Sequence, residues 1–334
     1  MADIRFGIIG WGYWGPKIAR NLDGLPQTSV AMVVDTDVRR LTSAVASQPG
    51  VRTTTQVQDV FNSDIDAVVI ATPVRTHYRL AKEALLHGKH ALVEKPLTAS
   101  VVEAEELIAL AKVQNLVLMV GHTFEYSPAV NELRKLVHSG DLGRIYCVET
   151  ERVNLGLFRN DINVIWDLAP HDVSILLYLF GKTPEQIKVQ AHAHLQSHVH
   201  DIAHLDLSYG DGMTAHIHVS WLHPCKIRRV TIIGDARMVV YDDTNPSEMI
   251  KIYNKGADVH ADPVVSYRYG AITIPHIDWI EPLRLECEDF VSAIRNGTQP
   301  RAHGGVGLAV VRVLAAAQEA LEQQESLSAT LVAR

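Results

Sequence analysis

The chain contains few cysteines and no long uninterrupted run of apolar residues. Its 334 residues include only Cys147, Cys225 and Cys287, which lie far apart and form no paired motif. An odd number of isolated cysteines argues against a disulfide framework and is typical of a reducing compartment. No stretch approaches the run of about 18 apolar residues of a membrane span, and the N-terminal segment is too acidic and too short in apolar residues for a signal peptide. We therefore expect a cytoplasmic protein that is not bound to a membrane.

The sequence also lacks a run of basic residues. It has 31 lysines and arginines against 38 aspartates and glutamates, for a formal net charge of -7. Nucleic-acid binding usually requires a basic stripe, so we expect no nucleic-acid partner. With 47% hydrophobic residues the chain can bury a sizeable core, and its length favours two domains.

Residues 1–121 alternate between strand-like and helix-like segments. Short runs rich in β-branched residues predict strands at residues 4–10, 29–35, 67–71, 90–94 and 116–121. Helical spacing of apolar residues predicts helices at residues 16–22, 79–86 and 101–113, the last with Ser100 as N-cap and Glu103 three residues later. Strands that alternate with helices form a parallel sheet covered on both faces. The first domain is therefore predicted to be a parallel α/β fold.

The pattern changes after residue 121. Helices are predicted at residues 128–137 and 171–180, and a strand at 144–153. Alternating strands follow from residue 187, including 203–209, 214–221, 229–233 and 238–241, and helices at 282–295 and 305–324 close the chain. Residues 254–280 show no regular pattern, so we expect a long loop that is functional or mobile. Residues 122–334 therefore predict an α+β domain with an open, mainly antiparallel sheet, whose last helices could pack back on the first domain.

A glycine-rich turn follows the first predicted strand. Gly10-Trp11-Gly12-Tyr13-Trp14-Gly15 fits the pattern G-x-G-x-x-G and leads through Pro16 into a helix. In such a turn the first glycine permits the tight bend, the second lets a pyrophosphate approach, and the third allows close packing of helix on strand. The free N–H groups at the start of the helix would face the phosphates. This turn predicts a Rossmann domain that binds a dinucleotide.

Asp35 lies twenty residues after Gly15, at the end of the second predicted strand. An acidic side chain at this point can hydrogen-bond the hydroxyls of a ribose and would repel a 2′-phosphate. The neighbouring Arg39 and Arg40 could hold such a phosphate, or could be solvated charges on the following helix. We expect NAD, with NADP as the less favoured alternative.

Three further motifs indicate which family of dinucleotide-binding proteins the chain resembles. They are Ala71-Thr72-Pro73 with His77, Glu94-Lys95-Pro96, and Asp167-Leu168-Ala169-Pro170-His171-Asp172. Together with the glycine turn they resemble the glucose–fructose oxidoreductase, inositol dehydrogenase and rhizopine catabolism (Gfo/Idh/MocA) family over essentially the whole chain. The resemblance implies an oxidoreductase with a Rossmann domain and an open-sheet domain, acting on carbinols of sugars, cyclitols or nucleotide sugars. Residues 121–126 are similar, more weakly, to a stretch in the nucleotide-sugar 3-dehydrogenases of that family.

The resemblance also implies a set of site residues. Cofactor contacts would fall on Gly10, Gly12, Tyr13, Trp14, Gly15, Asp35, Thr36, Arg40, Thr72, Pro73, His77, Glu94, Lys95 and Pro96. Substrate contacts would fall on His122, Tyr126, Trp166, Asp167 and His171. The Lys95–Pro96 peptide bond is expected to be cis, as in relatives. A homodimer or homotetramer is expected, because relatives associate through the open sheet.

Two pairs of histidines stand at alternate positions in the second half, His192 with His194 and His216 with His218. They lack a Cys, Asp or Glu partner at ligand spacing, and the resembled family requires no metal. We therefore expect a polar sheet face or a subunit interface, and no metal site.

Removing a hydride from a carbinol leaves a hydroxyl proton, so the protein must supply a base that works near neutral pH. His171 meets this need unaided, while Lys95 could stabilise the alkoxide or relay the proton. Asp167, four residues before His171 on the same helical face, would orient the substrate or the histidine, and Pro170 would fix the first turn of that helix. Two alternatives stay open: a glycoside hydrolase that oxidises its substrate transiently with NAD, and a non-catalytic cofactor-binding regulator.

Overall fold

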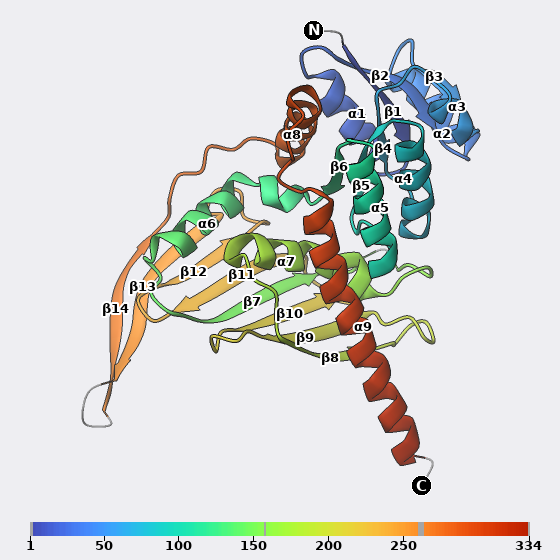
Figure 1. Cartoon of the computed structure of the whole chain (residues 1–334). Helices are drawn as coiled ribbons and strands as arrows, with labels where there is room; N and C mark the ends of the chain where they lie inside the picture. The colour runs from blue at the N-terminus through green and yellow to red at the C-terminus, as the bar shows by residue number, and fades with distance from the viewer. Residues whose placement is uncertain (1–2, 157, 260–263, 333–334) are drawn as a thin grey trace. The chain divides into compact units, whose positions relative to one another are not determined.

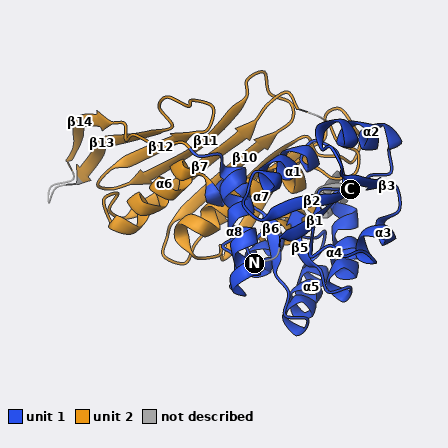
Figure 2. Ribbon diagram, turned by 90° about the horizontal axis from the view of Figure 1, so that it is seen from above, with its two compact units in different colours: residues 1–126, 280–312 blue, residues 127–279, 313–334 orange. Residues whose placement is uncertain are grey.

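The computed structural model describes residues 3–156, 158–259 and 264–332 (Figure 1). The chain divides into two compact units, coloured separately in Figure 2. Unit 1 comprises residues 1–126 and 280–312, and unit 2 comprises residues 127–279 and 313–334. Unit 1 thus includes a C-terminal segment that a single division after residue 121 would place in the second domain.

Unit 1 is built on a six-stranded parallel sheet in the order β3-β2-β1-β4-β5-β6. Its strands are β1 (Ile4–Ile9), β2 (Thr28–Val34), β3 (Arg52–Thr54), β4 (Ala67–Ile70), β5 (His90–Glu94) and β6 (Leu118–Gly121). This order reverses direction between β1 and β4, and a crevice that binds dinucleotides opens at such a point. The predicted parallel α/β fold is confirmed.

Helices cover both faces of this sheet. They are α1 (Gly15–Asp23), α2 (Val38–Ser47), α3 (Val57–Phe61), α4 (His77–Leu86), α5 (Val101–Val113) and α8 (Pro282–Asn296), with short 3-10 turns η1 (Val74–Thr76) and η2 (Thr123–Tyr126). Phe6 and Ile8 of β1 share one core with α1 and α8, where the rings of Phe6 and Phe290 lie 6.1 Å apart. Ser100 caps α5 by accepting the N–H of Glu103 at 3.4 Å, as predicted.

Unit 2 is built on an eight-stranded sheet in the order β14-β13-β12-β11-β7-β10-β9-β8. Its strands are β7 (Ile145–Val153), β8 (Gln186–His192), β9 (Ile202–Ser208), β10 (Thr214–Ser220), β11 (Ile227–Gly234), β12 (Met238–Asp242), β13 (Ile250–Val259) and β14 (Val265–Thr273). Among the strands that the structure describes in this sheet, only β7 and β10 are parallel neighbours, so the predicted mainly antiparallel sheet is confirmed. The helices α6 (Pro128–Ser139) and α7 (Val164–Phe180) pack on one face of it (Figure 1).

The expectation of a long irregular loop at residues 254–280 is wrong for most of that range. β13 and β14 form an antiparallel ribbon at the edge of the sheet, and residues 260–263 lie outside the described residues. The side chains of β14 are almost all exposed, so the strand lacks the alternation of apolar and polar residues that marks a half-buried strand.

The predicted start of the helix at residue 171 is also wrong. α7 begins at Val164, because the side chain of Asn163 accepts the N–H of Trp166 at 3.2 Å and caps the first turn. Pro170 therefore lies inside the helix, where its ring nitrogen cannot donate to the carbonyl one turn earlier. Asp167 and His171 still stand one turn apart on a single helix.

The helix α9 (Gly304–Val332) corrects a further expectation. Its segment Gly304–Gln324 has the length and apolar composition of a membrane span. We expected no membrane span because the sequence has no unbroken apolar run of sufficient length. This segment is nevertheless as apolar on average as a membrane span, although it contains the charged Arg312. Of the span-like window, 44% is buried in the structure, including Val310 and Leu314, and core helices share this composition. The segment is therefore weak evidence for a membrane span.

Candidate functional site

The glycine turn after β1 has the geometry of a phosphate cradle. Gly10 has a φ of +100°, and a Cβ added there would lie 2.5 Å from the carbonyl oxygen of Ala71. A Cβ on Gly15 would overlap the carbonyl oxygen of Gly10, so α1 can approach the turn this closely only because residue 15 has no side chain. At Gly12 the same position is open, with Arg40 Nη1 as its nearest neighbour at 3.9 Å. Each glycine therefore has the environment that its predicted role requires.

The start of α1 completes this cradle. Its N-cap residue, Trp14, provides no side-chain hydrogen bond to the first turn, and Pro16 occupies that turn. Backbone N–H groups at an uncapped helix start, together with the helix dipole, favour a phosphate group. Tyr13 is 72% exposed beside the turn, with Lys17 Nζ 3.3 Å from its ring centroid. The open Gly12 and the uncapped helix fit the pyrophosphate of a dinucleotide.

Asp35 stands at the end of β2 beside this turn. Its carboxylate accepts the backbone N–H groups of Trp11 at 2.7 Å and Asp37 at 2.8 Å. Arg40 Nη1 lies 3.4 Å from the same carboxylate, while Thr36 is exposed in the connection to α2. These bonds fix the carboxylate next to the glycine turn.

The neighbouring Arg39 points to a different partner. Its guanidinium pairs with Asp37 through Nε at 3.1 Å and Nη2 at 2.9 Å, and these bonds lower the pKa of the Asp37 carboxyl. Of the two arginines considered for a 2′-phosphate, only Arg40 is therefore directed toward Asp35.

The loops after β4 and β5 carry the next motifs. Thr72 is half-buried and its hydroxyl lies 2.7 Å from that of Thr76, while Pro73 is exposed. The Lys95–Pro96 peptide bond is cis, as expected, and Lys95 is half-buried. His77 is buried at the start of α4, with its ring nitrogens against the carbonyl oxygens of Thr72 and Pro96. Both loops lie at the carboxyl ends of strands, the edge where ligands bind in such sheets.

Several buried acids gather near the end of β5 and β6 in unit 1. Glu94 is only 8% exposed, and burial raises its pKa to about 7 although Lys95 acts in the opposite direction. Burial likewise raises the pKa of Glu125 in η2 to about 8, against the charge of Arg301. Glu286 on α8 is fully buried, and its pKa is raised well above the usual range by burial and by the charge of Glu94. These acids hold protons to higher pH than exposed glutamates do.

Two of the predicted substrate residues are buried in the same unit. His122 is 1% exposed, and burial together with the charge of Lys95 lowers its pKa to about 3. Tyr126 is 2% exposed, and its hydroxyl donates to Asp289 at 2.7 Å. His122 is therefore neutral at physiological pH, and the hydroxyl of Tyr126 is engaged within unit 1.

The third motif lies on α7 in unit 2. Asp167 Oδ2 accepts the indole N–H of Trp221 at 3.0 Å, and Oδ1 lies 3.7 Å from Arg159 Nη1. Trp166 and His171 are half-buried on the same helix. The structure thus holds the carboxylate of Asp167 in place one helical turn before His171.

The next residue, Asp172, has a structural partner. Its carboxylate accepts from Arg152 of β7 at 2.8 and 3.2 Å, and both side chains are buried. A buried ion pair of this kind fixes α7 on the sheet, since either charge alone would be costly to bury. This pair sets the position of the helix that carries Asp167 and His171.

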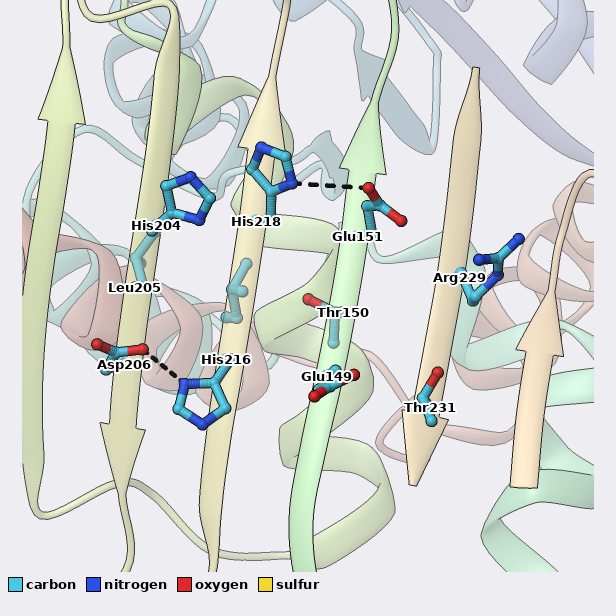
Figure 3. A pocket seen from close by; sticks show the side chains of 11 residues that line it. Glu149, Thr150, Glu151, His204, Leu205, Asp206, His216, His218, Arg229 and Thr231 are labelled. Atoms are coloured by element: carbon cyan, nitrogen blue, oxygen red, sulfur yellow. Dashed lines mark hydrogen bonds and ion pairs between the residues drawn. The ribbon is translucent and has the colours of Figure 1, made fainter. Parts of the chain in front are cut away.

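A hollow of about 300 Å³ lies on the exposed face of the sheet in unit 2. Dashed lines in Figure 3 join His216 to Asp206 and His218 to Glu151, and helices lie behind the sheet. The N···O distances of these two pairs are 2.6 and 3.7 Å. The rings of His204 and His218 stack at 4.3 Å. Because α7 packs on the opposite face, this hollow is separated from Asp167 and His171 by the sheet. Within residues 3–156, 158–259 and 264–332, no group of three or more potential ligands is placed to hold a metal ion.

Some residues of the site could not be assigned a role from the sequence. The charge of Glu94 raises the pKa of Glu286 across almost two hundred residues of chain, and Arg159 and Trp221 reach Asp167 from two different connections. None of these contacts leaves a local pattern. The sequence motif singled out Glu94 alone, and only the fold shows that Glu125 and Glu286 are buried in the same unit.

Comparison with known proteins agrees with this geometry. The NAD-binding Rossmann-fold domain of the GFO_IDH_MocA oxidoreductase family matches residues 4–122, and the GFO/IDH/MocA C-terminal domain matches residues 130–240. UDP-N-acetylglucosamine 3-dehydrogenase from Acidithiobacillus ferrooxidans is 32% identical over 321 residues, which span 95% of this chain and 96% of that protein.

Solved structures show the same relationship. UDP-N-acetylglucosamine 3-dehydrogenase GnnA from Acidithiobacillus ferrooxidans superimposes with a TM-score of 0.80 at 27% identity, covering 96% of this chain and 98% of that chain. GenD2 from gentamicin A biosynthesis, solved in complex with NAD, has the same fold, with a TM-score of 0.82, 24% identity and coverage of 96% and 94%. The matches extend over both units, and the chain belongs to the Gfo/Idh/MocA family of NAD-binding oxidoreductases.

Proposed function

We propose that this protein is an NAD-dependent dehydrogenase that moves a hydride between nicotinamide and a secondary alcohol of a sugar, cyclitol or nucleotide sugar. The observation that carries the proposal is the arrangement on α7. Trp221 and Arg159 hold the carboxylate of Asp167 one turn before His171. A fixed carboxylate beside an imidazole suits the binding of a hydroxyl group and the removal of its proton.

The residues of unit 1 would hold the cofactor. Gly12 would leave room for its pyrophosphate, while Gly10 and Gly15 permit the tight turn and the close approach of α1. The start of α1 would offer N–H groups to the phosphates. Tyr13, Trp14, Thr36, Thr72, Pro73, Glu94, Lys95 and Pro96 would border it along the carboxyl edge of the sheet. When bound, NAD supplies the acceptor or donor of the hydride.

Asp35 favours NAD over NADP. Its carboxylate is fixed by the N–H groups of Trp11 and Asp37 and is only 7% exposed, so a 2′-phosphate beside it would meet a poorly screened negative charge. Arg40 offsets part of that charge, whereas Arg39 is paired with Asp37. A lower Kd for NADP than for NAD in calorimetry would contradict this preference.

The protein handles the proton that the reaction releases. His171 would take the hydroxyl proton during oxidation, because imidazole titrates near neutral pH. Lys95 would stabilise the oxygen as it becomes negative, or relay the proton. Asp167 would orient the hydroxyl or the imidazole, and Trp166, His122 and Tyr126 are the remaining candidates for shaping the substrate site.

The test is a spectrophotometric panel. Purified protein is mixed with NAD, then NADP, and with sugars, inositols and nucleotide sugars including UDP-N-acetylglucosamine, while NADH absorbance is followed at mildly alkaline pH. Steady NADH formation with one class supports the proposal and names the substrate. Release of free sugar from a glycoside without net NADH would favour the hydrolase alternative, and cofactor binding without any turnover would favour a regulator.

We also propose that the protein is a cytoplasmic homodimer or homotetramer. The free thiols of Cys147, Cys225 and Cys287 are consistent with a reducing compartment, and the exposed face of the sheet in unit 2 is broad and rich in paired charges. Light scattering at micromolar concentration is the test, and a monomeric mass contradicts the assembly.

A further inference from the structure

His77 lies between two loops of unit 1. It begins α4, is 1% exposed, and uses both of its ring nitrogens. Nδ1 lies 2.8 Å from the carbonyl oxygen of Pro96, and Nε2 lies 2.8 Å from that of Thr72. Thr72 follows β4 and Pro96 follows β5, which are neighbouring strands. One buried side chain therefore joins the two loops at the carboxyl edge of the sheet.

These two loops would face one half of the dinucleotide. The glycine turn follows β1 and Asp35 follows β2, which places the pyrophosphate and the adenosine ribose at those strands. A dinucleotide that crosses the point where the strand order reverses then carries its nicotinamide half toward β4 and β5. The loops joined by His77 would thus contact the nicotinamide half and not the adenosine half.

The chemistry of the two contacts defines the protonation state of the His77 ring. A carbonyl oxygen can only accept a hydrogen bond, and a neutral imidazole has one N–H group and one lone pair. Two bonds of 2.8 Å to carbonyl oxygens therefore require a hydrogen on each nitrogen, which only the imidazolium has. Burial and the position of His77 at the start of a helix both oppose a cation, while the two carbonyl dipoles favour it.

We propose that His77 is a positioning residue: a doubly protonated ring that ties the loop after β4 to the loop after β5 and so presets Thr72 and Lys95 for the nicotinamide half of the cofactor. The ring acts through the two loops and does not itself touch the cofactor, which differs from the direct contact implied by the family resemblance. The inference rests on the cofactor placement proposed above, but it does not depend on the identity of the substrate.

The first experiment compares NAD⁺ with ADP-ribose, which lacks the nicotinamide, by isothermal titration calorimetry. His77→Phe keeps a ring and removes both N–H groups, and His77→Asn retains a donor that can reach one carbonyl. His87→Phe, near the other end of α4, is the matched control, because its exposed ring contacts Glu83 of the same helix and the ring of Phe61 and joins no loops.

We expect His77→Phe to weaken NAD⁺ binding by about tenfold or more, to leave ADP-ribose binding almost unchanged, and to be partly rescued in His77→Asn. Equal losses for both ligands would mean a general structural role and would overturn the proposal, as would no loss for either ligand. If His77→Phe does not fold, His77→Asn decides the same comparison. Equal affinity of the unaltered protein for NAD⁺ and ADP-ribose would count against the cofactor placement instead.

The second experiment measures the protonation state of the His77 ring directly by NMR. In protein labelled with ¹⁵N-histidine, a doubly protonated ring gives two N–H nitrogens, whereas a neutral tautomer gives one protonated and one bare nitrogen. The difference between spectra of the unaltered protein and of His77→Asn identifies the His77 signals. Two protonated nitrogens at neutral pH support the proposal, and a neutral tautomer overturns it whatever the binding data show.

Discussion

Alanine placed at two glycines of the phosphate turn should separate the folding of unit 1 from its binding of the cofactor. At Gly12 the position of an added methyl group is open, with Arg40 Nη1 as the nearest atom at 3.9 Å. At Gly15 the same methyl group overlaps the carbonyl oxygen of Gly10, a backbone atom that cannot rotate away. Gly12→Ala should therefore fold normally and bind the dinucleotide poorly, whereas Gly15→Ala should also lose stability.

The magnitudes follow from these contacts. Overpacking costs about 1–3 kcal/mol, and at about 2–4 °C per kcal/mol Gly15→Ala should lower the Tm by about 2–12 °C. Gly12→Ala should leave the Tm unchanged or slightly raised, because the unfolded chain loses entropy worth about 0.4–1 kcal/mol. Its Kd for NAD⁺ should rise about tenfold or more, since the methyl group stands where the pyrophosphate would approach.

Scanning calorimetry of the protein without cofactor gives the Tm, and titration with NAD⁺ and ADP-ribose gives the Kd. Gly24→Ala, at the other end of α1, is the matched control, because a methyl group there meets only ordinary contacts of 3.4 Å. Normal ADP-ribose binding by Gly12→Ala would refute the placement of the pyrophosphate. An unchanged Tm of Gly15→Ala would refute the packing argument.

Lys95→Met and His171→Ala should each lower kcat by about 100-fold or more while NAD⁺ still binds; near-normal turnover in either variant contradicts the proposed proton chemistry. Arg152→Met leaves Asp172 buried without its cation, so urea titration should show a loss of about 3–5 kcal/mol, against less than about 1 kcal/mol for Arg229→Met in an exposed pair. The raised pKa values of Glu94 and Glu125 mean that the folded chain keeps protons that the unfolded chain has lost above pH 4.5. The Tm should therefore fall as the pH rises from about 4.5 through about 8, and Glu125→Gln should flatten that fall; parallel Tm curves for the two proteins would show that Glu125 is not the source.

Much of unit 1 could be predicted because its signals are local. The glycine turn, the cap at Ser100 and the acid at Asp35 each need only a short stretch of sequence, and the structure places each in the expected element. The elements β3 and α3 were not predicted, because β3 has only three residues and α3 only five, too short for an apolar period to be recognised.

Unit 2 shows the limits of the same reasoning. Pro170 suggested a helix start, yet the side chain of Asn163 caps an α7 that begins about two turns earlier. β13 pairs with β14 at an exposed edge, where hydrogen bonding defines the strands and side-chain pattern does not. Trp221, which donates to Asp167, lies 54 residues later in the chain, and a tertiary contact of this kind leaves no spacing that could be detected in the sequence.

The discontinuity of unit 1 has a consequence for how the chain folds during synthesis. The sheet is complete at Gly121, but α8, which covers the side of it that carries Phe6, begins about 160 residues later. At about 5–20 residues per second, a ribosome makes that segment in about 8–30 s. During this interval the nascent sheet exposes an apolar face that the mature protein buries, which is a binding surface for chaperones. A fragment that ends near Tyr126 would keep that exposed face permanently, so a cofactor-binding unit made on its own needs residues 280–312 joined to it.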